Sequence, residues 1–255
     1  MKILALDSTA VTAAVAVCED EKLLASYTLN NGNTHSETLL PMIESMLGQL
    51  RMTVRDIDLF VCSAGPGSFT GVRIGVSTIK GLAFAADADP AEPHGKSKPC
   101  VGVSTLEALS LNLRGVGFAD AVICPVMNAR RGQVYNALFE ADETSSSGIK
   151  RLCEDRLITV AALDDELAES YTDRKVFLCG DGYDIALSMM KRTAPESTPE
   201  PLRYQSGYSV AVCGLNAYKA GSFTDDLGLK PVYLRPSQAE RERAEKLAEA
   251  SDTTK

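Results

Sequence analysis

The sequence has no tryptophan and only two histidines, His35 and His94, among its 255 residues. A metal site or a general base built on imidazole would therefore depend on one of these two side chains. Position 39, one helical turn after His35, is Leu39 and supplies no second ligand. We therefore interpret His35 as a structural or interface residue rather than a catalytic one, and the loop sequence around His94 makes it a poor catalytic candidate.

Paired cysteines are also missing, because the seven cysteines are scattered singly and none belongs to a Cys-x-x-Cys motif. Most of them lie inside apolar stretches. An odd number of isolated cysteines in a chain of this size predicts reduced thiols in the core, and it argues against disulfides and against a zinc site.

No apolar run is long enough to span a membrane, and the first residues, 1–7, are too short and too soon acidic for a signal peptide. We therefore expect a cytoplasmic protein without a membrane partner. Acidic residues outnumber basic ones by 34 to 26, which gives a net charge of -8. A chain that grips RNA alone usually has a basic face, so any nucleic acid is expected to be held by another subunit.

The chain is long enough for two lobes, and its first 30 residues predict an antiparallel meander. Apolar segments at 2–7, 12–18 and 23–29 are separated by short polar turns. Lobes of the actin and ribonuclease H type begin in this way, with an acid and hydroxyls at the first turn. Asp7 in that turn has two interpretations: it bonds nearby amides, or it faces a nucleotide phosphate or metal.

The glycine-rich segment 63–75 follows an apolar strand at 57–62 and precedes a predicted helix at 70–86. Gly65 and Gly67 suit a tight turn, and Ser68 or Thr70 can cap the helix. Such a helix start can bind phosphate, but no lysine follows the last glycine, and the spacing differs from that of dinucleotide-binding turns. A plain strand-to-helix turn therefore remains the alternative.

Two predicted helices have apolar faces wide enough for more than one neighbour. The first begins near Thr34, which has capping-box spacing to Glu37, and continues toward position 50. The second, at 70–86, has Gly71 and Gly75 four residues apart, which permits close approach of another backbone. That backbone belongs either to the chain's own sheet or to a partner protein.

The second lobe is expected to begin at residue 104. Strands are predicted at 121–127 and 134–139, joined by a hairpin with two exposed cations, and a further strand at 176–179 precedes Gly180-Asp181-Gly182. We expect three parts: a first lobe at 1–103, a second at 104–236 whose helix at about 208–220 can pack back on the first lobe, and a charged, flexible tail at 237–255.

Several segments together resemble the TsaB (YeaZ) family. They are Asp7-Ser8-Thr9, His35-Ser36-Glu37-x-Leu39-Leu40-Pro41, Gly65-Pro66-Gly67-Ser68-Phe69-Thr70-Gly71-x-Arg73-Ile74-Gly75, Val103-Ser104-Thr105-Leu106-Glu107, Ala129-Arg130-Arg131-Gly132 and Pro231-Val232-Tyr233-Leu234-Arg235-Pro236. The resemblance implies a two-lobed, actin-like α/β fold of the ASKHA (ribonuclease H-like) type, in which each lobe is a mixed sheet flanked by helices.

The resemblance also implies a function in forming threonylcarbamoyladenosine in tRNA. It implies a scaffold that pairs with the catalytic subunit TsaD, acts with the ATPase TsaE, and forms a homodimer when alone. It further implies that tRNA is reached only through the complex. No cofactor is implied for the chain itself, and any ATP or ADP is expected at the boundary with TsaD.

The resemblance assigns two sets of site residues. The expected partner interface is His35, Glu37, Leu39, Leu40, Ile43, Met46, Leu47, Phe69, Gly71, Val72, Gly75 and Ile79. The residues expected to face a nucleotide or phosphate are Asp7, Ser8, Thr9, Gly65, Gly67, Ser68, Thr70 and Arg73. A bulky residue at position 75 is expected to abolish pairing and to leave the fold intact.

The residues argue against catalysis by this chain. TsaD-type relatives have a His-x-x-x-His metal pair, and the matching positions here are Thr105 and Leu109, which cannot replace imidazole. Asn128 and Gln133 stand where the family usually has acids. The alternatives are a stand-alone ATPase or metallopeptidase-like enzyme, and a homodimeric module that binds adenine nucleotide without turnover.

Overall fold

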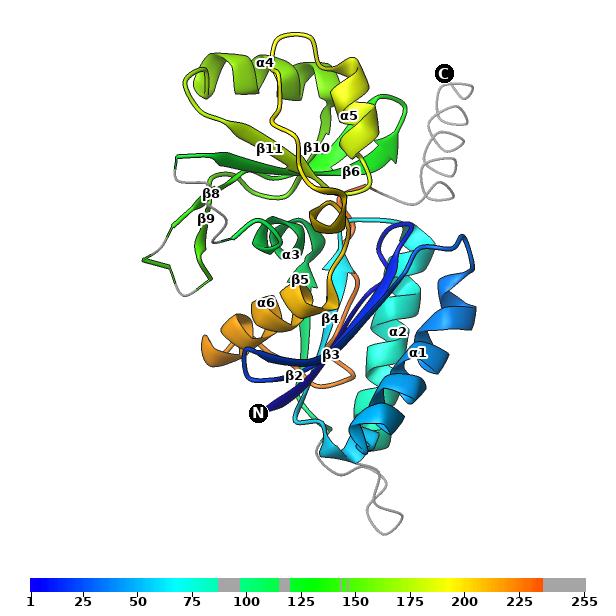
Figure 1. Cartoon of the computed structure of the whole chain (residues 1–255). Helices are drawn as coiled ribbons and strands as arrows, with labels where there is room; N and C mark the ends of the chain where they lie inside the picture. Colours follow the sequence, from blue (N-terminus) through cyan, green and yellow to red (C-terminus); the bar gives the residue numbers. More distant parts are fainter. Residues whose placement is uncertain (87–96, 115–119, 143, 146, 236–255) are drawn as a thin grey trace, which may run out of the picture.

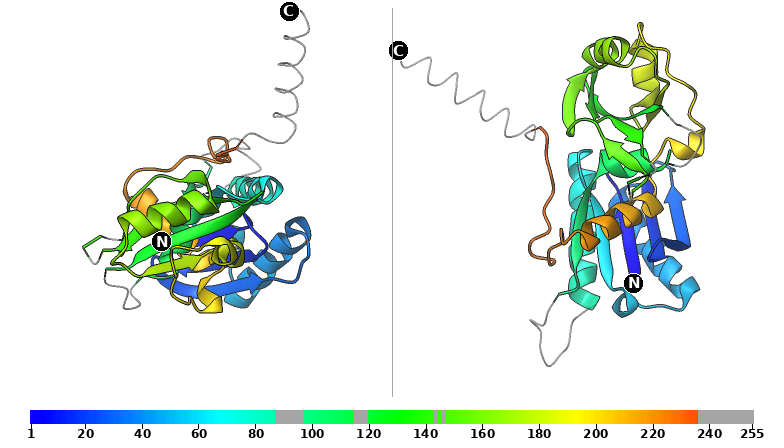
Figure 2. Two further views of the ribbon diagram at one scale, coloured as in Figure 1. Left: turned by 90° about the horizontal axis from the view of Figure 1, so that it is seen from above. Right: turned by 90° about the vertical axis from the view of Figure 1, so that its left-hand side faces the viewer.

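The computed structural model describes residues 1–86, 97–114, 120–142, 144–145 and 147–235. It consists of two lobes, each with a mixed β-sheet, stacked along the long axis of the molecule (Figures 1 and 2). The expected tail at 237–255 and most of the loop around His94 lie outside the described residues.

The first lobe is organised around a five-stranded sheet of order β3-β2-β1-β4-β5. Its strands are β1 (Lys2–Asp7), β2 (Ala13–Glu19), β3 (Lys22–Leu29), β4 (Leu59–Gly65) and β5 (Cys100–Ser104). The first three form the antiparallel meander that the sequence predicts, and β4 pairs with β1 in parallel. Because β1 is central, both of its faces are buried.

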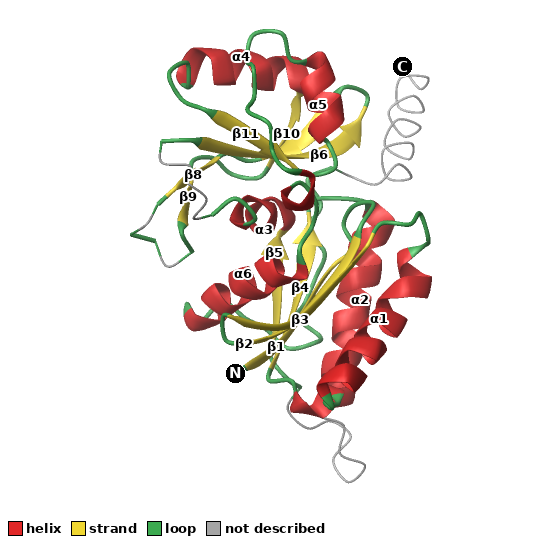
Figure 3. Cartoon of the chain, in the orientation of Figure 1, coloured by secondary structure: helices red, strands yellow, loops and turns green. Residues whose placement is uncertain are grey.

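Helices cover both faces of this sheet (Figure 3). They are α1 (His35–Leu50) and α2 (Phe69–Ala86) on one face, and α6 (Gly207–Lys219) on the other, with the short 3-10 turn η1 (Val54–Asp56) before β4. Alternation along β1 divides the core accordingly, since Leu4 and Leu6 pack with α1 and α2, whereas Ile3 and Ala5 pack with α6.

The second lobe repeats the strand pattern of the first. It contains β6 (Val122–Arg130), β7 (Gln133–Asn136), β8 (Phe139–Ala141), β9 (Ile149–Arg151), β10 (Arg156–Thr159) and β11 (Val176–Cys179), with α4 (Val160–Ser170), α5 (Tyr183–Met189) and the 3-10 turn η2 (Glu200–Leu202). Strands β6, β7 and β10 form an antiparallel meander, and β11 pairs with β6 in parallel, as β4 does with β1. This duplication confirms the two-lobed actin-like α/β fold.

A central helical layer joins the lobes. Helix α3 (Thr105–Leu111) packs on α6 and on β6. One hydrophobic cluster contains Val61 of the first sheet, Leu109 of α3, Ile123 of the second sheet and Leu215 of α6. The lobes therefore share a core rather than meeting only at a flexible linker.

Several sequence predictions are confirmed and two are wrong in detail. All seven cysteines are free thiols and six are buried. The expected strand at 134–139 is interrupted at Ala137 and Leu138, so that it forms β7 and β8. The capping box at Thr34 does not form, because the Thr34 side chain makes no capping hydrogen bond. Within the described residues, no helix is long and apolar enough to cross a membrane.

Candidate functional site

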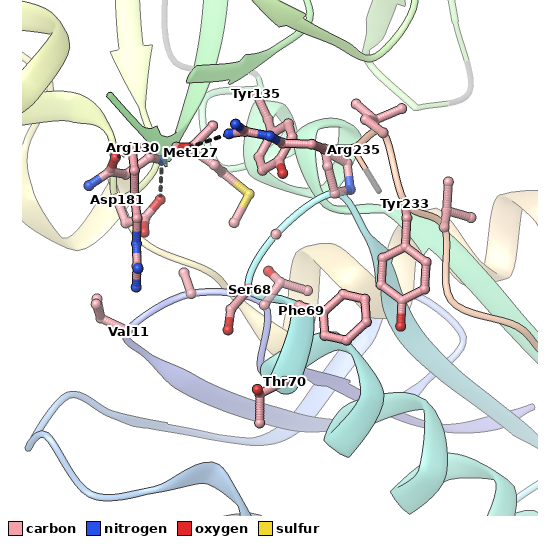
Figure 4. A pocket seen from close by; sticks show the side chains of 18 residues that line it. Val11, Ser68, Phe69, Thr70, Met127, Arg130, Tyr135, Asp181, Tyr233 and Arg235 are labelled. Atoms are coloured by element: carbon pink, nitrogen blue, oxygen red, sulfur yellow. Dashed lines mark hydrogen bonds between the residues drawn. The ribbon is translucent and has the colours of Figure 1, made fainter. Parts of the chain in front are cut away.

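A cavity of about 650 Å³ lies between the two lobes (Figure 4). Its walls come from equivalent places in the duplicated lobes: the β1–β2 and β4–α2 turns of the first, and the β6–β7 and β11–α5 turns of the second. A segment near the described C-terminus supplies the remaining wall. The lining residues are Thr9, Ala10, Val11, Pro66, Gly67, Ser68, Phe69, Thr70, Met127, Asn128, Ala129, Arg130, Tyr135, Asp181, Val232, Tyr233, Leu234 and Arg235.

The β1–β2 turn is organised by the buried carboxylate of Asp7. The amide and hydroxyl of Thr9 both donate to Asp7 Oδ1, at 2.8 and 2.7 Å. Burial raises the pKa of Asp7, and the neighbouring side chain of Ser63 and the hydrogen bonds from Thr9 oppose that rise. The second oxygen, Oδ2, is buried without a hydrogen-bond partner among the described residues. Asp7 thus performs the turn-forming role and keeps one unused acceptor behind the cavity wall.

The glycine-rich turn packs tightly against the same β1–β2 turn. A Cβ atom on Gly67 would lie 2.6 Å from the Thr9 carbonyl oxygen, and one on Gly71 would overlap the carbonyl oxygen of Ser8. The Ser68 amide donates to Thr9 O at 2.7 Å, and the Gly71 amide donates to Ser68 Oγ at 3.3 Å. These amides are therefore used inside the chain, and the glycines serve close backbone packing.

The opposite wall contains a half-buried acid, Asp181, in the β11–α5 turn. Its Oδ1 accepts a hydrogen bond from the Asn128 amide at 3.1 Å. Burial raises the pKa of Asp181 from 3.8 to about 6; the bond from Asn128 opposes this rise and the negative charge of Asp7 adds to it. The cavity therefore has an acid on the wall of the second lobe, Asp181, and another, Asp7, behind the wall of the first.

This raised pKa predicts how stability depends on pH. The folded state holds the Asp181 proton more tightly than the unfolded chain, so the stabilisation is complete below about pH 4 and is lost as the pH rises toward 6. Asp181→Asn keeps an acceptor for the Asn128 amide and cannot ionise. We expect its free energy of unfolding to rise relative to that of the original chain between pH 4 and pH 6, as measured by urea denaturation.

Asp184→Asn is a matched control, because Asp184 is an exposed acid three residues away in α5. This variant should follow the pH profile of the original chain. A constant difference between Asp181→Asn and the original chain from pH 4 to pH 7 would contradict the proposed burial of the acid.

A C-terminal strap, residues 229–235, closes one side of the cavity and contacts both lobes. The Val232 amide donates to Ala64 O at 2.7 Å, and the Arg235 guanidinium donates to Ala129 O at 3.5 Å. Tyr233 stacks on Phe69 of α2, with ring centroids 4.7 Å apart. The strap therefore links the first sheet, α2 and the β6–β7 hairpin.

The structure separates the eight residues predicted to face a phosphate into three groups. Thr9, Gly67, Ser68 and Thr70 line the cavity, whereas Asp7, Ser8 and Gly65 are buried behind its wall. Arg73 does not line the cavity. Its guanidinium lies 3.9 Å from the Phe69 ring centroid and its Nε donates to the Tyr233 hydroxyl at 2.9 Å, so its predicted position is corrected.

The predicted partner residues also divide by exposure. His35, Glu37, Leu40 and Phe69 are exposed or half-buried, and Leu40 is 53% exposed. Eight others, Leu39, Ile43, Met46, Leu47, Gly71, Val72, Gly75 and Ile79, are buried in this chain. These eight attach α1 and α2 to their own lobe, and the expectation that they contact a partner is corrected to the extent that they are not exposed in this chain.

Gly75 shows the physical reason for this correction. A Cβ atom at this position would lie 2.6 Å from Ser8 Oγ and 3.1 Å from Leu6 Cδ1, both on or beside β1. The close approach that the glycine spacing predicts is therefore between α2 and its own sheet. A bulky residue at position 75 would strain this lobe and would not act on pairing alone.

The outer surface of α1 and α2 contains a shallow groove of about 310 Å³. It is lined by His35, Ser36, Leu39, Leu40, Arg73, Ile74, Ser77 and Thr78. His35 Nε2 donates to Ala10 O at 2.7 Å, so the start of α1 is bonded to a residue that lines the interlobe cavity. This contact gives His35 a structural role.

The two positions that the resemblance matches to an expected metal pair lie in α3. Thr105 and Leu109 are both fully buried, and the Leu109 carbonyl accepts a hydrogen bond from the Cys179 thiol at 3.6 Å. Leu109 also lies beside Gly180, where a Cβ atom would approach its Cδ1 to 3.3 Å. Apolar packing thus occupies this part of the interlobe layer.

Sequence reasoning did not assign Arg130, Tyr135, Tyr233 and Arg235 to the cavity, and it brought the turn of Asp181 to a shared site only under the ATPase alternative. Gly180-Asp181-Gly182 follows an apolar strand, as the glycine-rich segment 63–75 does. This similarity is the sequence signal that indicates a second site turn at Asp181. The strap has no such signal, because its position depends on contacts with residues more than 100 positions earlier.

Comparisons with known proteins agree with this architecture. Residues 22–220 match the family model described as TsaD, tRNA N6-adenosine threonylcarbamoyltransferase. The TsaB protein of Bacillus subtilis, described as a tRNA threonylcarbamoyladenosine biosynthesis protein, is 30% identical over 94% of this chain and 96% of its own length. The Escherichia coli protein of the same description is 34% identical over 56% of this chain and 57% of its own length.

The structure of YeaZ from Pseudomonas aeruginosa superposes with a TM-score of 0.74 at 22% identity, covering 91% of this chain and 99% of that one. That likeness supports the fold. The identity to the Bacillus protein extends over nearly the whole length of both chains. This chain therefore belongs to the TsaB (YeaZ) family of tRNA threonylcarbamoyladenosine biosynthesis proteins.

Proposed function

We propose that the chain is a non-catalytic scaffold subunit that pairs with TsaD and activates it in forming threonylcarbamoyladenosine. The observation that carries this proposal is that Thr105 and Leu109 of α3 are packed between the two lobes, where a metal pair would be expected. Both side chains are fully buried, and neither can act as a metal ligand of the kind expected in a TsaD-type site. Activity then requires a second subunit, which acts in the cytoplasm together with the ATPase TsaE.

The docking surface in this proposal is the outer face of α1 and α2. The groove there is partly apolar, Leu40 is 53% exposed, and Ile74 and Arg73 lie on the facing helix. An exposed leucine beside a groove is a suitable anchor for an apolar partner surface. A second copy of the chain occupies the same face when TsaD is absent.

Any ATP or ADP is proposed to bind at the boundary with TsaD rather than in a complete site of this chain. Ser68 and Thr70 are exposed and offer hydroxyls to the interlobe cavity, whereas the Thr9 hydroxyl donates to Asp7. The Ser68 and Gly71 amides of the glycine-rich turn, however, already donate to Thr9 O and Ser68 Oγ. A nucleotide phosphate would therefore find fewer free backbone donors than a dedicated phosphate-binding turn provides.

Reconstitution tests the proposal. The purified chain alone, TsaD alone, their mixture, and the mixture with TsaE are each assayed for nucleotide hydrolysis and for threonylcarbamoyladenosine in tRNA by mass spectrometry. We expect the chain alone to be inactive in both assays and the complete mixture to modify tRNA. Multiple turnovers by the isolated chain would refute the scaffold role and favour the stand-alone ATPase or peptidase-like alternative.

A further inference from the structure

Two arginines at the tip of the β6–β7 hairpin have no carboxylate partner among the described residues. The sequence holds 34 acidic and 26 basic residues, so partners are abundant. Five other arginines form ion pairs within the described part of the chain: Arg114, Arg151, Arg156, Arg174 and Arg192. Arg130 and Arg131 are both exposed. The hairpin thus presents unneutralised positive charge on an acidic protein.

The hairpin backbone holds these arginines in a conformation that arginine does not favour. Arg130, Arg131 and Gly132 have φ values of 65°, 55° and 69°, all in the left-handed region. Asparagine and glycine suit such a turn better than arginine does. The Arg130 amide donates to Asn128 Oδ1 at 2.8 Å, and Gly132 O accepts from the Val160 amide at 3.0 Å. These two hydrogen bonds fix the hairpin backbone at both ends of the turn. The turn conformation itself gives no reason for arginine at positions 130 and 131.

The two charged elements meet at the opening of the interlobe cavity. Figure 4 shows Arg130 extending toward Val11, while Arg235 of the strap approaches the same hairpin from the other side. The hydrogen bond from Arg235 to Ala129 O attaches this second arginine to the hairpin that carries Arg130. Neither arginine forms an ion pair with Asp181, which lies on the cavity wall.

We propose that Arg130, Arg131 and Arg235 form a contact for the phosphodiester backbone of the tRNA substrate. This inference rests on the proposed function and adds that the scaffold itself touches the RNA. The charge distribution favours a polyanion passing over the opening. A small anion entering the cavity would approach Asp181 and, behind the wall, the buried Asp7. Backbone phosphates outside the cavity meet the exposed guanidinium groups of Arg130 and Arg131 and the half-buried one of Arg235.

The test uses the complex of this chain with TsaD and fluorescently labelled tRNA. Binding is measured by anisotropy from 50 to 300 mM salt for the original chain and for the double variant Arg130→Asn/Arg131→Asn. We expect weaker binding at low salt, and a slope of log affinity against log salt that is shallower by about 0.7 to 0.9 per arginine removed. Asparagine tolerates left-handed backbone, so the melting temperature should not fall.

Arg51→Asn is a matched control. Arg51 is exposed, has a φ of 54°, and has no carboxylate partner among the described residues, but it caps the end of α1. Its substitution should leave the salt slope unchanged.

An unchanged slope in the double variant would overturn the inference. So would a variant that binds tRNA normally but loses binding of inorganic phosphate or ATP, because the site would then serve a small anion. Size-exclusion chromatography of the same samples reports separately whether the chain pairs with TsaD. Failure to pair would therefore contradict the proposed function, whereas normal pairing with unchanged RNA binding would contradict only the arginine contact.

Discussion

Gly71→Ala is expected to destabilise the first lobe by about 3 kcal/mol or more. A Cβ atom at Gly71 would overlap the Ser8 carbonyl oxygen, which belongs to the backbone of the β1–β2 turn and cannot rotate away. Relief requires α2 to move from the sheet, and that movement would disturb the hydrogen bond from Ser8 Oγ to Gly71 O, at 2.8 Å. Chemical denaturation measures the loss directly.

Gly81→Ala provides the matched control in the same helix. Gly81 is exposed, and a Cβ atom there would meet nothing within 4 Å. Removing a glycine from an exposed helix interior should stabilise the protein by up to about 1 kcal/mol. Both substitutions replace glycine by alanine, and we expect them to change the free energy of unfolding in opposite directions. Similar stabilities for both variants would mean that α2 does not pack against the β1–β2 turn as described.

Leu40→Lys is expected to weaken pairing with TsaD strongly without unfolding the chain. Leu40 is 53% exposed on α1, so lysine can extend into water in the isolated protein. In a complex, the same ammonium group would be buried against the partner's apolar surface, which is strongly unfavourable. We expect affinity for TsaD to fall roughly 30-fold or more, and unfolding free energy to change by less than about 0.5 kcal/mol. Isothermal titration calorimetry and denaturation measure these quantities.

Leu187→Lys controls for the loss of an exposed leucine, because Leu187 is 44% exposed on α5 in the other lobe. Its affinity for TsaD should match that of the original chain. Undiminished pairing by Leu40→Lys would exclude the α1–α2 face as the docking surface. In the absence of TsaD, we expect the same contrast in self-association: Leu40→Lys should weaken it, and Leu187→Lys should leave it unchanged.

The sequence predicts local structure better than it predicts which neighbour an apolar face contacts. The meander from β1 to β3 follows from strand-like segments separated by short polar turns, and the structure confirms it. The glycines of α2 correctly indicate close backbone approach. Nothing in their spacing, however, distinguishes a strand of the same lobe from a partner helix, and the structure assigns Gly71 and Gly75 to the former.

The candidate site was predicted in part for a similar reason. Turns at the ends of β1 and β4 are local features, so Thr9, Ser68 and Thr70 could be placed at a site from sequence. Asp181 and Arg235 reach that cavity through the stacking of two lobes and the return of the strap. The turn of Asp181 can be recognised by its likeness to the first glycine turn, but the position of Arg235 depends on long-range packing, for which a single sequence carries no direct signal.

The late position of α6 has a consequence for biosynthesis. When a ribosome has released only the first 110 residues, the sheet that contains β1 has α1 and α2 on one side, but Ile3, Ala5 and Val61 on the other still lack the helix that covers them. That apolar face of the sheet remains exposed to solvent until α6, which ends at Lys219, has left the ribosomal exit tunnel. A nascent chain of this protein should therefore be a target for trigger-factor-type holdases through most of its translation.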